Sequence, residues 1–303
     1  MTRGLLVMSY GTPERLEDVE PYYTHIRRGS PPPPELLDEL VARYRAVGGP
    51  TALNRITRRQ AAALKATLGD RGAHVQLYVG FKHVAPFIGD VVEQMAIDGI
   101  KQAVGLVLAP HYSLRSIAEY QKYAENKRPD GMRLDIISSW HDHPAFVDGL
   151  ARRLSDALEG AGDNPHVVFT AHSVPAAVLD RNDPYPEQLQ RTAQLVAEAV
   201  GLDDWSRAYQ SAGRTGEPWL GPDILETIEE LAGRGVRSVV VQSIGFVADH
   251  LEVLYDLDIE VRDLANRRGL AYARAAMQND DPDFIQALAT IVEDRLATVE
   301  STG

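Results

Sequence analysis

The sequence contains no cysteine. This absence excludes disulfide bonds, thiolate zinc sites, a cysteine nucleophile and an iron–sulfur cluster held by cysteine. Any metal ion must therefore be held by His, Asp, Glu or Tyr. Long apolar runs are also absent from the N-terminus, MTRGLLVMSYGTP, whose short apolar stretch is too brief for a signal peptide or a membrane span. We expect a cytoplasmic protein with no stable membrane insertion.

Lysine is scarce, with only 5 residues, and the formal net charge is −12. This balance argues against nucleic acid as a partner, because a nucleic-acid site normally shows a basic patch. Hydrophobic residues make up 44% of the chain and charged residues 24%, as in soluble globular proteins. At about 150 residues per domain, the 303 residues suggest two domains.

Short apolar runs alternate with helical stretches, which is typical of βαβ units and a parallel sheet. The expected strands form two sets of four: 4–9, 75–80, 104–109 and 133–138, then 167–171, 207–211, 238–243 and 270–274. We therefore predict an α/β fold of two Rossmann-like domains, each a four-stranded parallel sheet flanked by helices. Ligands bind at the carboxyl ends of such strands, so the active site is expected in the interdomain cleft.

The stretch 145–160 has apolar residues at helical spacing and ends in glycine, so it is expected to lead into the second set of strands. This places the boundary near 142–146, with domains at 1–144 and 145–303 and a last helix that could pack back on the first domain. A long polar excursion, 11–50, follows the first strand. Its run of prolines, 31–34, predicts a loop before a helix that begins around Glu35. An insertion at the cleft edge favours a binding role over a plain surface connection.

The segment GFVADHLEVLYDLDIE, 245–260, carries Glu252, Asp256 and Glu260 at four-residue steps on an expected helix. Like charges at this spacing destabilise a helix by roughly 0.2–0.5 kcal/mol per pair, so stability gives no reason for the line, whereas a cation would. The alternative is a solvated acidic face. In VVFTAHSVP, 167–175, an apolar strand ends directly in His172. An imidazole facing carboxylates could hold Fe²⁺ and accept protons, so the two segments indicate metal chemistry.

Other histidines are expected to have lesser roles. His250 shares no helix face with Glu252 and is expected to support the helix start. His141 and His143 flank Asp142 in an interdomain loop, where we expect them to be exposed. His83 and His111 follow strands in the first half and could border the cleft.

Seven segments together resemble one family. They are MSYGTP (8–13), HIRRG (25–29), RYRAVGG (43–49), APHYS (109–113), TAHSVP (170–175), YQSAGRTGEPWLGPD (209–223) and GFVADHLEVLYDLDIE (245–260). From Gly4 to the final helix the chain is similar to the ferrochelatases, and most similar to the coproporphyrin III ferrochelatases of monoderm bacteria. That family has two Rossmann-like domains with a porphyrin between them, and it inserts Fe²⁺ as a substrate without a consumed cofactor.

The resemblance implies roles for individual residues. His172 would be the catalytic proton acceptor and Glu252 its partner across the cleft, as metal ligand or proton relay. Asp256 and Glu260 would continue an acidic line for metal or protons along a helix that is locally π-wound in relatives. Tyr10 would ligate product iron from the other face, although a phenol packed in the core is the alternative.

The resemblance also implies a set of porphyrin contacts. The residues expected to hold propionates or the macrocycle edge are Arg27, Arg43, Tyr44 and Tyr120, and Ile26 would pack against the ring face. In GGPTALN, 48–54, Thr51 stands where relatives carry serine, and its hydroxyl can still donate to a propionate. A hydrated Mg²⁺ beside the acidic helix is a further expectation.

We therefore predict insertion of Fe²⁺ into coproporphyrin III to give coproheme in haem biosynthesis, by a monomer that meets a coproheme-accepting enzyme transiently. Four alternatives stay open at this point. They are a protoporphyrin IX ferrochelatase, another tetrapyrrole chelatase of the same fold, a non-catalytic porphyrin or haem carrier, and a two-lobed solute-binding protein.

Overall fold

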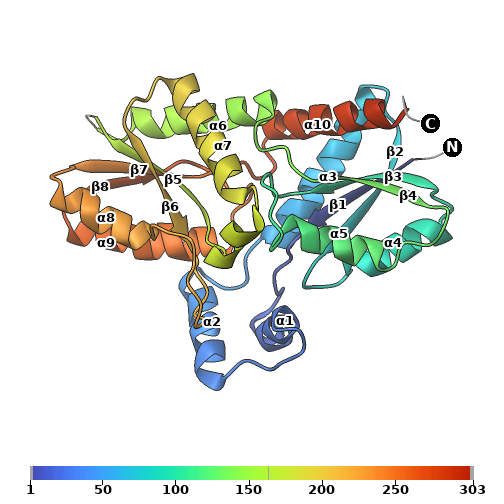
Figure 1. Cartoon of the computed structure of the whole chain (residues 1–303), viewed down its shortest axis with the longest axis horizontal. Helices are drawn as coiled ribbons and strands as arrows, with labels where there is room; N and C mark the ends of the chain where they lie inside the picture. The colour runs from blue at the N-terminus through green and yellow to red at the C-terminus, as the bar shows by residue number, and fades with distance from the viewer. Residues whose placement is uncertain (1–2, 163, 301–303) are drawn as a thin grey trace.

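The computed structural model describes residues 3–162 and 164–300, which form two parallel sheets flanked by helices (Figure 1). The elements up to the end of the first sheet are β1 (Arg3–Ser9), a short 3₁₀ turn (Leu16–Asp18), α1 (Val19–Ile26), α2 (Pro34–Ala46), α3 (Leu53–Asp70), β2 (Val75–Phe81), α4 (Ile88–Ile97), β3 (Gln102–Val107), α5 (Ile117–Glu125) and β4 (Arg133–Ile137).

The rest of the chain builds the second sheet. Its elements are α6 (Pro144–Glu159), β5 (His166–His172), a 3₁₀ segment (Ala176–Arg181), α7 (Tyr185–Val200), β6 (Trp205–Gln210), α8 (Ile224–Gly233), β7 (Ser238–Ser243), a π-helix (Val253–Val261), α9 (Arg262–Arg267), β8 (Ala271–Arg274) and α10 (Pro282–Glu300). No helix within residues 3–162 and 164–300 is both long and apolar enough to cross a bilayer.

The two sheets have the same topology. The strand orders are β2-β1-β3-β4 and β6-β5-β7-β8, and every strand pair is parallel. In each sheet the chain leaves the first strand to one side and returns on the other, so β1 and β5 end at the point where the strand order reverses. Open α/β sheets bind ligands at that point. The predicted pair of four-stranded parallel α/β sheets is confirmed.

The central strands are apolar because helices cover both of their faces. Leu5 to Met8 in β1 and Val239 to Val241 in β7 are fully buried. A parallel strand covered on both faces is expected to be a continuous apolar run rather than an alternating one. The sequence pattern and the burial therefore agree along these strands.

One continuous core joins the two sheets. It contains Leu5 of β1, Leu64 of α3, Phe146 of α6, Phe169 of β5 and Leu288 of α10. The last helix, α10, packs against both α3 and α6, and Figure 1 shows it lying across the top of the molecule. The sheets are therefore held at a fixed distance by packed helices. The domain boundary at 144/145 stays a prediction.

Three expected boundaries differ from the structure. The third strand was expected at 104–109, but β3 is Gln102–Val107, because the chain after it approaches Pro110, which has no N–H to donate. The strand expected at 207–211 ends at Gln210, because Ser211 adopts a left-handed conformation with φ of 60°. Pro34 is the first residue of α2, a position where the missing N–H costs nothing.

The expectation that His141 and His143 are exposed is wrong. Their side chains are only 15% and 19% exposed. Ser139 Oγ lies 2.8 Å from Nδ1 of His141, and the carbonyl of His141 accepts a hydrogen bond from Thr192 of α7. Asp294 of α10 lies 3.4 Å from Nε2 of His143. Two helices that come much later in the sequence therefore cover this loop.

Candidate active site

His172 is the last residue of β5, at the point where the strand order of its sheet reverses. Its Nε2 lies 3.5 Å from Oε1 of Glu252, and the two side chains are 33% and 36% exposed. Tyr185 of α7 donates its hydroxyl to the carbonyl oxygen of His172 at 2.9 Å, and this bond fixes the end of the strand. The structure therefore brings the two predicted catalytic residues together at an accessible position.

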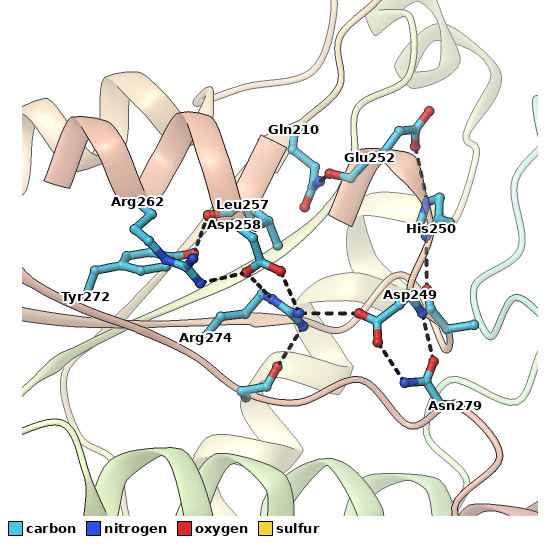
Figure 2. Close-up of polar contacts among 12 residues, drawn as sticks. Gln210, Asp249, His250, Glu252, Leu257, Asp258, Arg262, Tyr272, Arg274 and Asn279 are labelled. Carbon is cyan, nitrogen blue, oxygen red and sulfur yellow. Dashed lines mark hydrogen bonds and ion pairs between the residues drawn. The ribbon is translucent and has the colours of Figure 1, made fainter. Parts of the chain in front are cut away.

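Glu252 stands at the entrance of the π-helix Val253–Val261. Its backbone carbonyl accepts a hydrogen bond from Nε2 of Gln210 at 3.0 Å, and its Oε2 lies 3.6 Å from Nε2 of His250. His250 is held in turn through Nδ1, 3.0 Å from the carbonyl of Ala248 (Figure 2). His250 thus supports Glu252 from the side opposite His172, as a residue at the helix start would.

The charges of His172 and Glu252 shift the pKa of both groups. Burial alone would lower the pKa of His172, but the neighbouring Glu252 carboxylate outweighs it and raises that pKa to about 9. Burial would raise the pKa of Glu252, yet His172 and His250 hold it well below its usual range. At neutral pH the pair is therefore an imidazolium and a carboxylate that share one proton.

The predicted π-winding is present over Val253–Val261. At about 4.4 residues per turn, a four-residue step falls roughly 30° short of a full turn, so Glu252, Asp256 and Glu260 follow a shallow line along one side. Asp256 is only 7% exposed, receives a hydrogen bond from Ser211 Oγ and lies 3.6 Å from Arg43 Nη1. The carboxylate line therefore runs inward from Glu252.

The inner carboxylates bind protons more readily than Glu252. Burial, followed by the charge of Glu252, raises the pKa of Asp256 to about 6. Burial also raises the pKa of Glu260. Neighbouring acids whose environments push their pKa values apart are the pattern expected of groups that pass protons.

Tyr10 occupies the matching place in the N-terminal sheet, directly after β1, and is 38% exposed. His83 lies with its ring 4.4 Å from the Tyr10 ring, and Lys82 Nζ lies 5.4 Å from the same ring. Burial first, and then the charge of Glu252, raises the pKa of Tyr10. The ends of β1 and β5 therefore share one electrostatic environment.

A second histidine, His25 of α1, extends this face into the excursion. Its Nδ1 lies 3.0 Å from Nδ1 of His83, so one ring donates and the other accepts. Burial, and then the charge of Lys82, lowers the pKa of His83 to about 3, so His83 is neutral. His25 also lines a pocket of about 440 Å³ with Glu20, Pro21, Thr24 and Gly29. The insertion thus adds a wall beside Tyr10.

The remaining predicted contact residues lie at two depths. Arg27 is exposed and Ile26 is half-buried at the end of α1, while Tyr44 and Tyr120 are almost fully buried. The Tyr44 hydroxyl lies 3.1 Å from Thr12 Oγ1, and Thr51 Oγ1 donates to the same Thr12 oxygen at 3.4 Å. Arg43 is engaged by Glu39 at 3.2 Å and lies over the Tyr255 ring at 4.8 Å.

Sequence reasoning missed Lys82, Gln210 and Ser211. Lys82 is buried, pairs with Glu119 at 2.7 Å, and lies 5.4 Å and 5.3 Å from the rings of Tyr10 and Tyr120. All three missed residues stand at or next to the carboxyl ends of β2 and β6. The rule that located His172 would therefore have found them.

No three His, Cys, Asp or Glu side chains converge as a closed metal centre within residues 3–162 and 164–300. What the site offers is the pair His172 and Glu252, followed by separate inner carboxylates. A structural metal site is closed by protein ligands, whereas a site that works on a metal keeps positions open. The arrangement suits a metal ion that is handed on to other ligands.

His111 was expected to border the cleft, but it is a buried residue between the two sheets. Thr192 donates its hydroxyl to the His141 carbonyl, so it accepts from Nε2–H of His111 at 2.8 Å. Burial lowers the pKa of His111 well below its usual range. Below pH 6.5 only the unfolded chain then binds this proton, so stability falls as pH falls, by up to about 1.4 kcal/mol per pH unit.

We therefore expect His111→Gln to flatten the decline of stability between about pH 6.5 and pH 5, since Gln keeps a hydrogen bond but does not titrate. Urea denaturation at several pH values would measure the slope. An unchanged slope in the variant would show that His111 does not carry this proton linkage.

The fold and the site together define an α/β metal-handling enzyme, in which the ends of two parallel sheets present a histidine–carboxylate pair and a tyrosine. The family model for ferrochelatase matches residues 2–296. The chain belongs to the ferrochelatase family, whose members insert metal into porphyrin.

Two relatives illustrate the family match. The coproporphyrin III ferrochelatase of Halalkalibacterium halodurans is 44% identical over 98% of both chains. The ferrochelatase of Herpetosiphon aurantiacus is 45% identical over 95% of this chain and 97% of its own. Among solved structures, SirB from Bacillus subtilis with Fe³⁺ has a TM-score of 0.63 at 14% identity and covers 99% of this chain and 98% of its own. At that identity, the likeness to SirB shows the shared fold alone.

Proposed function

We propose that the protein inserts Fe²⁺ into coproporphyrin III and yields coproheme, with iron as a substrate. The observation that carries this proposal is the placement of His172 with Glu252 and of Tyr10 at the ends of the first strands of the two sheets. A flat macrocycle between these ends would meet a histidine–carboxylate pair on one face and a phenol on the other. Relatives at 42–45% identity named coproporphyrin III ferrochelatase support the substrate.

Metal insertion requires two pyrrole protons to leave and a hydrated Fe²⁺ to lose water. His172 is assigned as the group that accepts protons from the macrocycle, and Glu252 as ligand or relay beside it. Asp256 and Glu260 extend from Glu252 along the π-helix, where they offer oxygen ligands or proton carriers. Tyr10 would reach the product iron from the opposite face, where its phenol is accessible.

Binding energy far from the metal can assist the reaction. A planar porphyrin exposes its nitrogen lone pairs poorly, and a bent one exposes them better. Contacts to the propionates can offset the strain of bending, so arginines at the periphery contribute to the rate. Arg27 is exposed and available for such a contact, whereas Arg43 must exchange its Glu39 and Asp256 partners for a propionate.

A preference for protoporphyrin IX is the second candidate, because the relative from Herpetosiphon aurantiacus carries the broader name ferrochelatase at a similar identity. The excursion favours the more acidic substrate. It presents the exposed arginines Arg27, Arg28 and Arg45 along with Arg43. A shielded Arg–carboxylate contact contributes roughly 1.5–3 kcal/mol and an exposed one far less.

We expect kcat/KM for coproporphyrin III to exceed that for protoporphyrin IX by at least about tenfold, because the loss of two propionates removes at least one shielded contact. The measurement follows anaerobic Fe²⁺ insertion, as the four-banded free-base spectrum becomes a metalloporphyrin spectrum, in detergent low enough to keep both porphyrins monomeric. A ratio at or below one would rule out the coproporphyrin assignment and leave the family activity intact. A carrier would bind both porphyrins and convert neither.

A further inference from the structure

The course of the acidic line depends on the π-helix. In an α-helix a four-residue step overshoots a full turn by about 40°, whereas in a π-helix it falls roughly 30° short. Glu260, eight residues after Glu252, would therefore move by about 145° around the axis if Val253–Val261 were α-helical. π-Helices are rare and mostly limited to single turns. A nine-residue π-helix needs contacts that hold its register from outside.

Arg274, the last residue of β8, makes such a contact (Figure 2). Its guanidinium binds Asp258 of the π-helix with two bonds, Nε to Oδ1 at 2.7 Å and Nη2 to Oδ2 at 2.8 Å. Nη2 also reaches Oδ1 of Asp249 at 3.3 Å. The side chain of Arg274 is only 12% exposed and that of Asp258 19%. A planar fork on a largely buried carboxylate fixes orientation as well as charge.

Asp249 is fixed on its other side by Asn279. The amide of Asn279 donates to Oδ2 of Asp249 at 2.7 Å, and its oxygen accepts the backbone N–H of Asp249 at 2.8 Å. Gln60 of α3 donates to the carbonyl of Asn279 at 2.7 Å. Both ends of the segment 249–258, which contains His250, Glu252 and Asp256, are thus tied to one frame of the chain.

Tyr272 adds a third tie from the same face of β8, two residues before Arg274. Its hydroxyl donates to the carbonyl of Leu257 at 2.8 Å. That carbonyl also accepts the backbone N–H of Arg262, five residues later, which is the bond that defines the π-winding. Strand β8 therefore contacts the π-helix at two consecutive residues, Leu257 and Asp258.

We propose that Arg274 is a positioning residue that sets the π-helical register of Val253–Val261, and through it the placement of Glu252 beside His172. Arg274 has no contact with His172 or Glu252 and acts through Asp258 and Asp249 (Figure 2). The inference rests on the role proposed above for the acidic line. Loosening the register should slow the chemical step while the porphyrin still binds.

The test is Arg274→Lys, which keeps the positive charge and loses the fork. We expect kcat for iron insertion to fall at least tenfold, with KM for the porphyrin within about twofold of wild type. Hydrogen exchange of the free enzyme, followed by mass spectrometry, should speed up in peptides covering 253–261 and stay unchanged in β5 and β7. The matched control is Arg71→Lys, since Arg71 of the α3 end bonds Glu293 of α10 at 2.7 Å, away from the π-helix. It should leave kcat and the exchange of 253–261 as in wild type.

A second variant, Asp258→Asn, breaks the same fork and preserves volume, so it decides the matter if Arg274→Lys does not fold. The double variant should have a kcat no more than about twofold below the worse single variant, because both changes remove one interaction. An unchanged kcat with unchanged exchange in 253–261, or exchange that rises equally across the chain, would overturn the positioning role. The exchange experiment needs no turnover. Selective loosening in a chain that inserts no iron would therefore support the register and reject the proposed function.

Discussion

His172→Ala is expected to abolish iron insertion while the porphyrin still binds. The imidazole is the group placed to accept pyrrole protons, and it stands at the end of β5 with Nε2 3.5 Å from Glu252. Its removal leaves the expected propionate contacts of the excursion untouched. Anaerobic initial rates, together with a porphyrin titration of the variant, would measure both parts of the prediction.

The matched control is His166→Ala, because His166 is the first residue of the same strand and His172 the last. His166 lies 3.0 Å from Ser206 Oγ, away from the site, so its loss should affect stability without stopping turnover. A His172→Ala variant that keeps more than about a tenth of the wild-type rate has lost less than about 1.4 kcal/mol of transition-state stabilisation. His172 would then not be the essential base.

The state of the resting pair sharpens this interpretation. With a pKa raised to about 9 by Glu252, His172 already carries a proton at neutral pH. It becomes a base once that proton leaves, and a divalent cation near the carboxylate favours the loss because it opposes the charge that raised the pKa. The proton has a nearby acceptor in Asp256, whose pKa is about 6.

The order of elements and the ends of strands are predictable from the sequence because both are local signals. An apolar run that stops at His172, and another that stops before Tyr10, place both residues at the carboxyl ends of strands. The parallel topology then brings such ends to one edge of each sheet. The spacing of Glu252, Asp256 and Glu260 marks the acidic segment in the same way, since repeated like charges have no structural benefit.

What could not be predicted depends on contacts between distant segments. Arg43 is separated by more than 200 residues from Asp256, yet their atoms are 3.6 Å apart, and no local pattern announces the pairing. The burial of His141 and His143 likewise comes from α7 and α10, which the loop sequence does not contain. Lys82 had a local signal, its position directly after β2, but its two aromatic partners come from elsewhere in the chain.

Glu252→Gln is expected to lower the insertion rate by at least about tenfold, or about 1.4 kcal/mol, and to impair it more than Glu260→Gln. Both substitutions keep the shape of the side chain and remove its charge. Glu252 contacts His172 directly, whereas Glu260 lies eight residues further along the π-helix. Loss of the Glu252 charge also removes the cause of the raised pKa of His172, so the pair no longer stores a proton or offers an anionic oxygen to iron.

The measurement compares kcat of the two variants at saturating porphyrin, with Fe²⁺ varied over a wide range under anaerobic conditions. If Glu252 meets the metal or relays its protons, added Fe²⁺ will not restore the rate of Glu252→Gln. Glu260→Gln, in contrast, should recover at high Fe²⁺ if Glu260 only guides the metal inward. Equal losses in the two variants, or a larger loss at Glu260, would contradict the order in which the chemistry proceeds along the line. The acidic segment would then act as a single charged surface, and His172 would be left without a distinct partner.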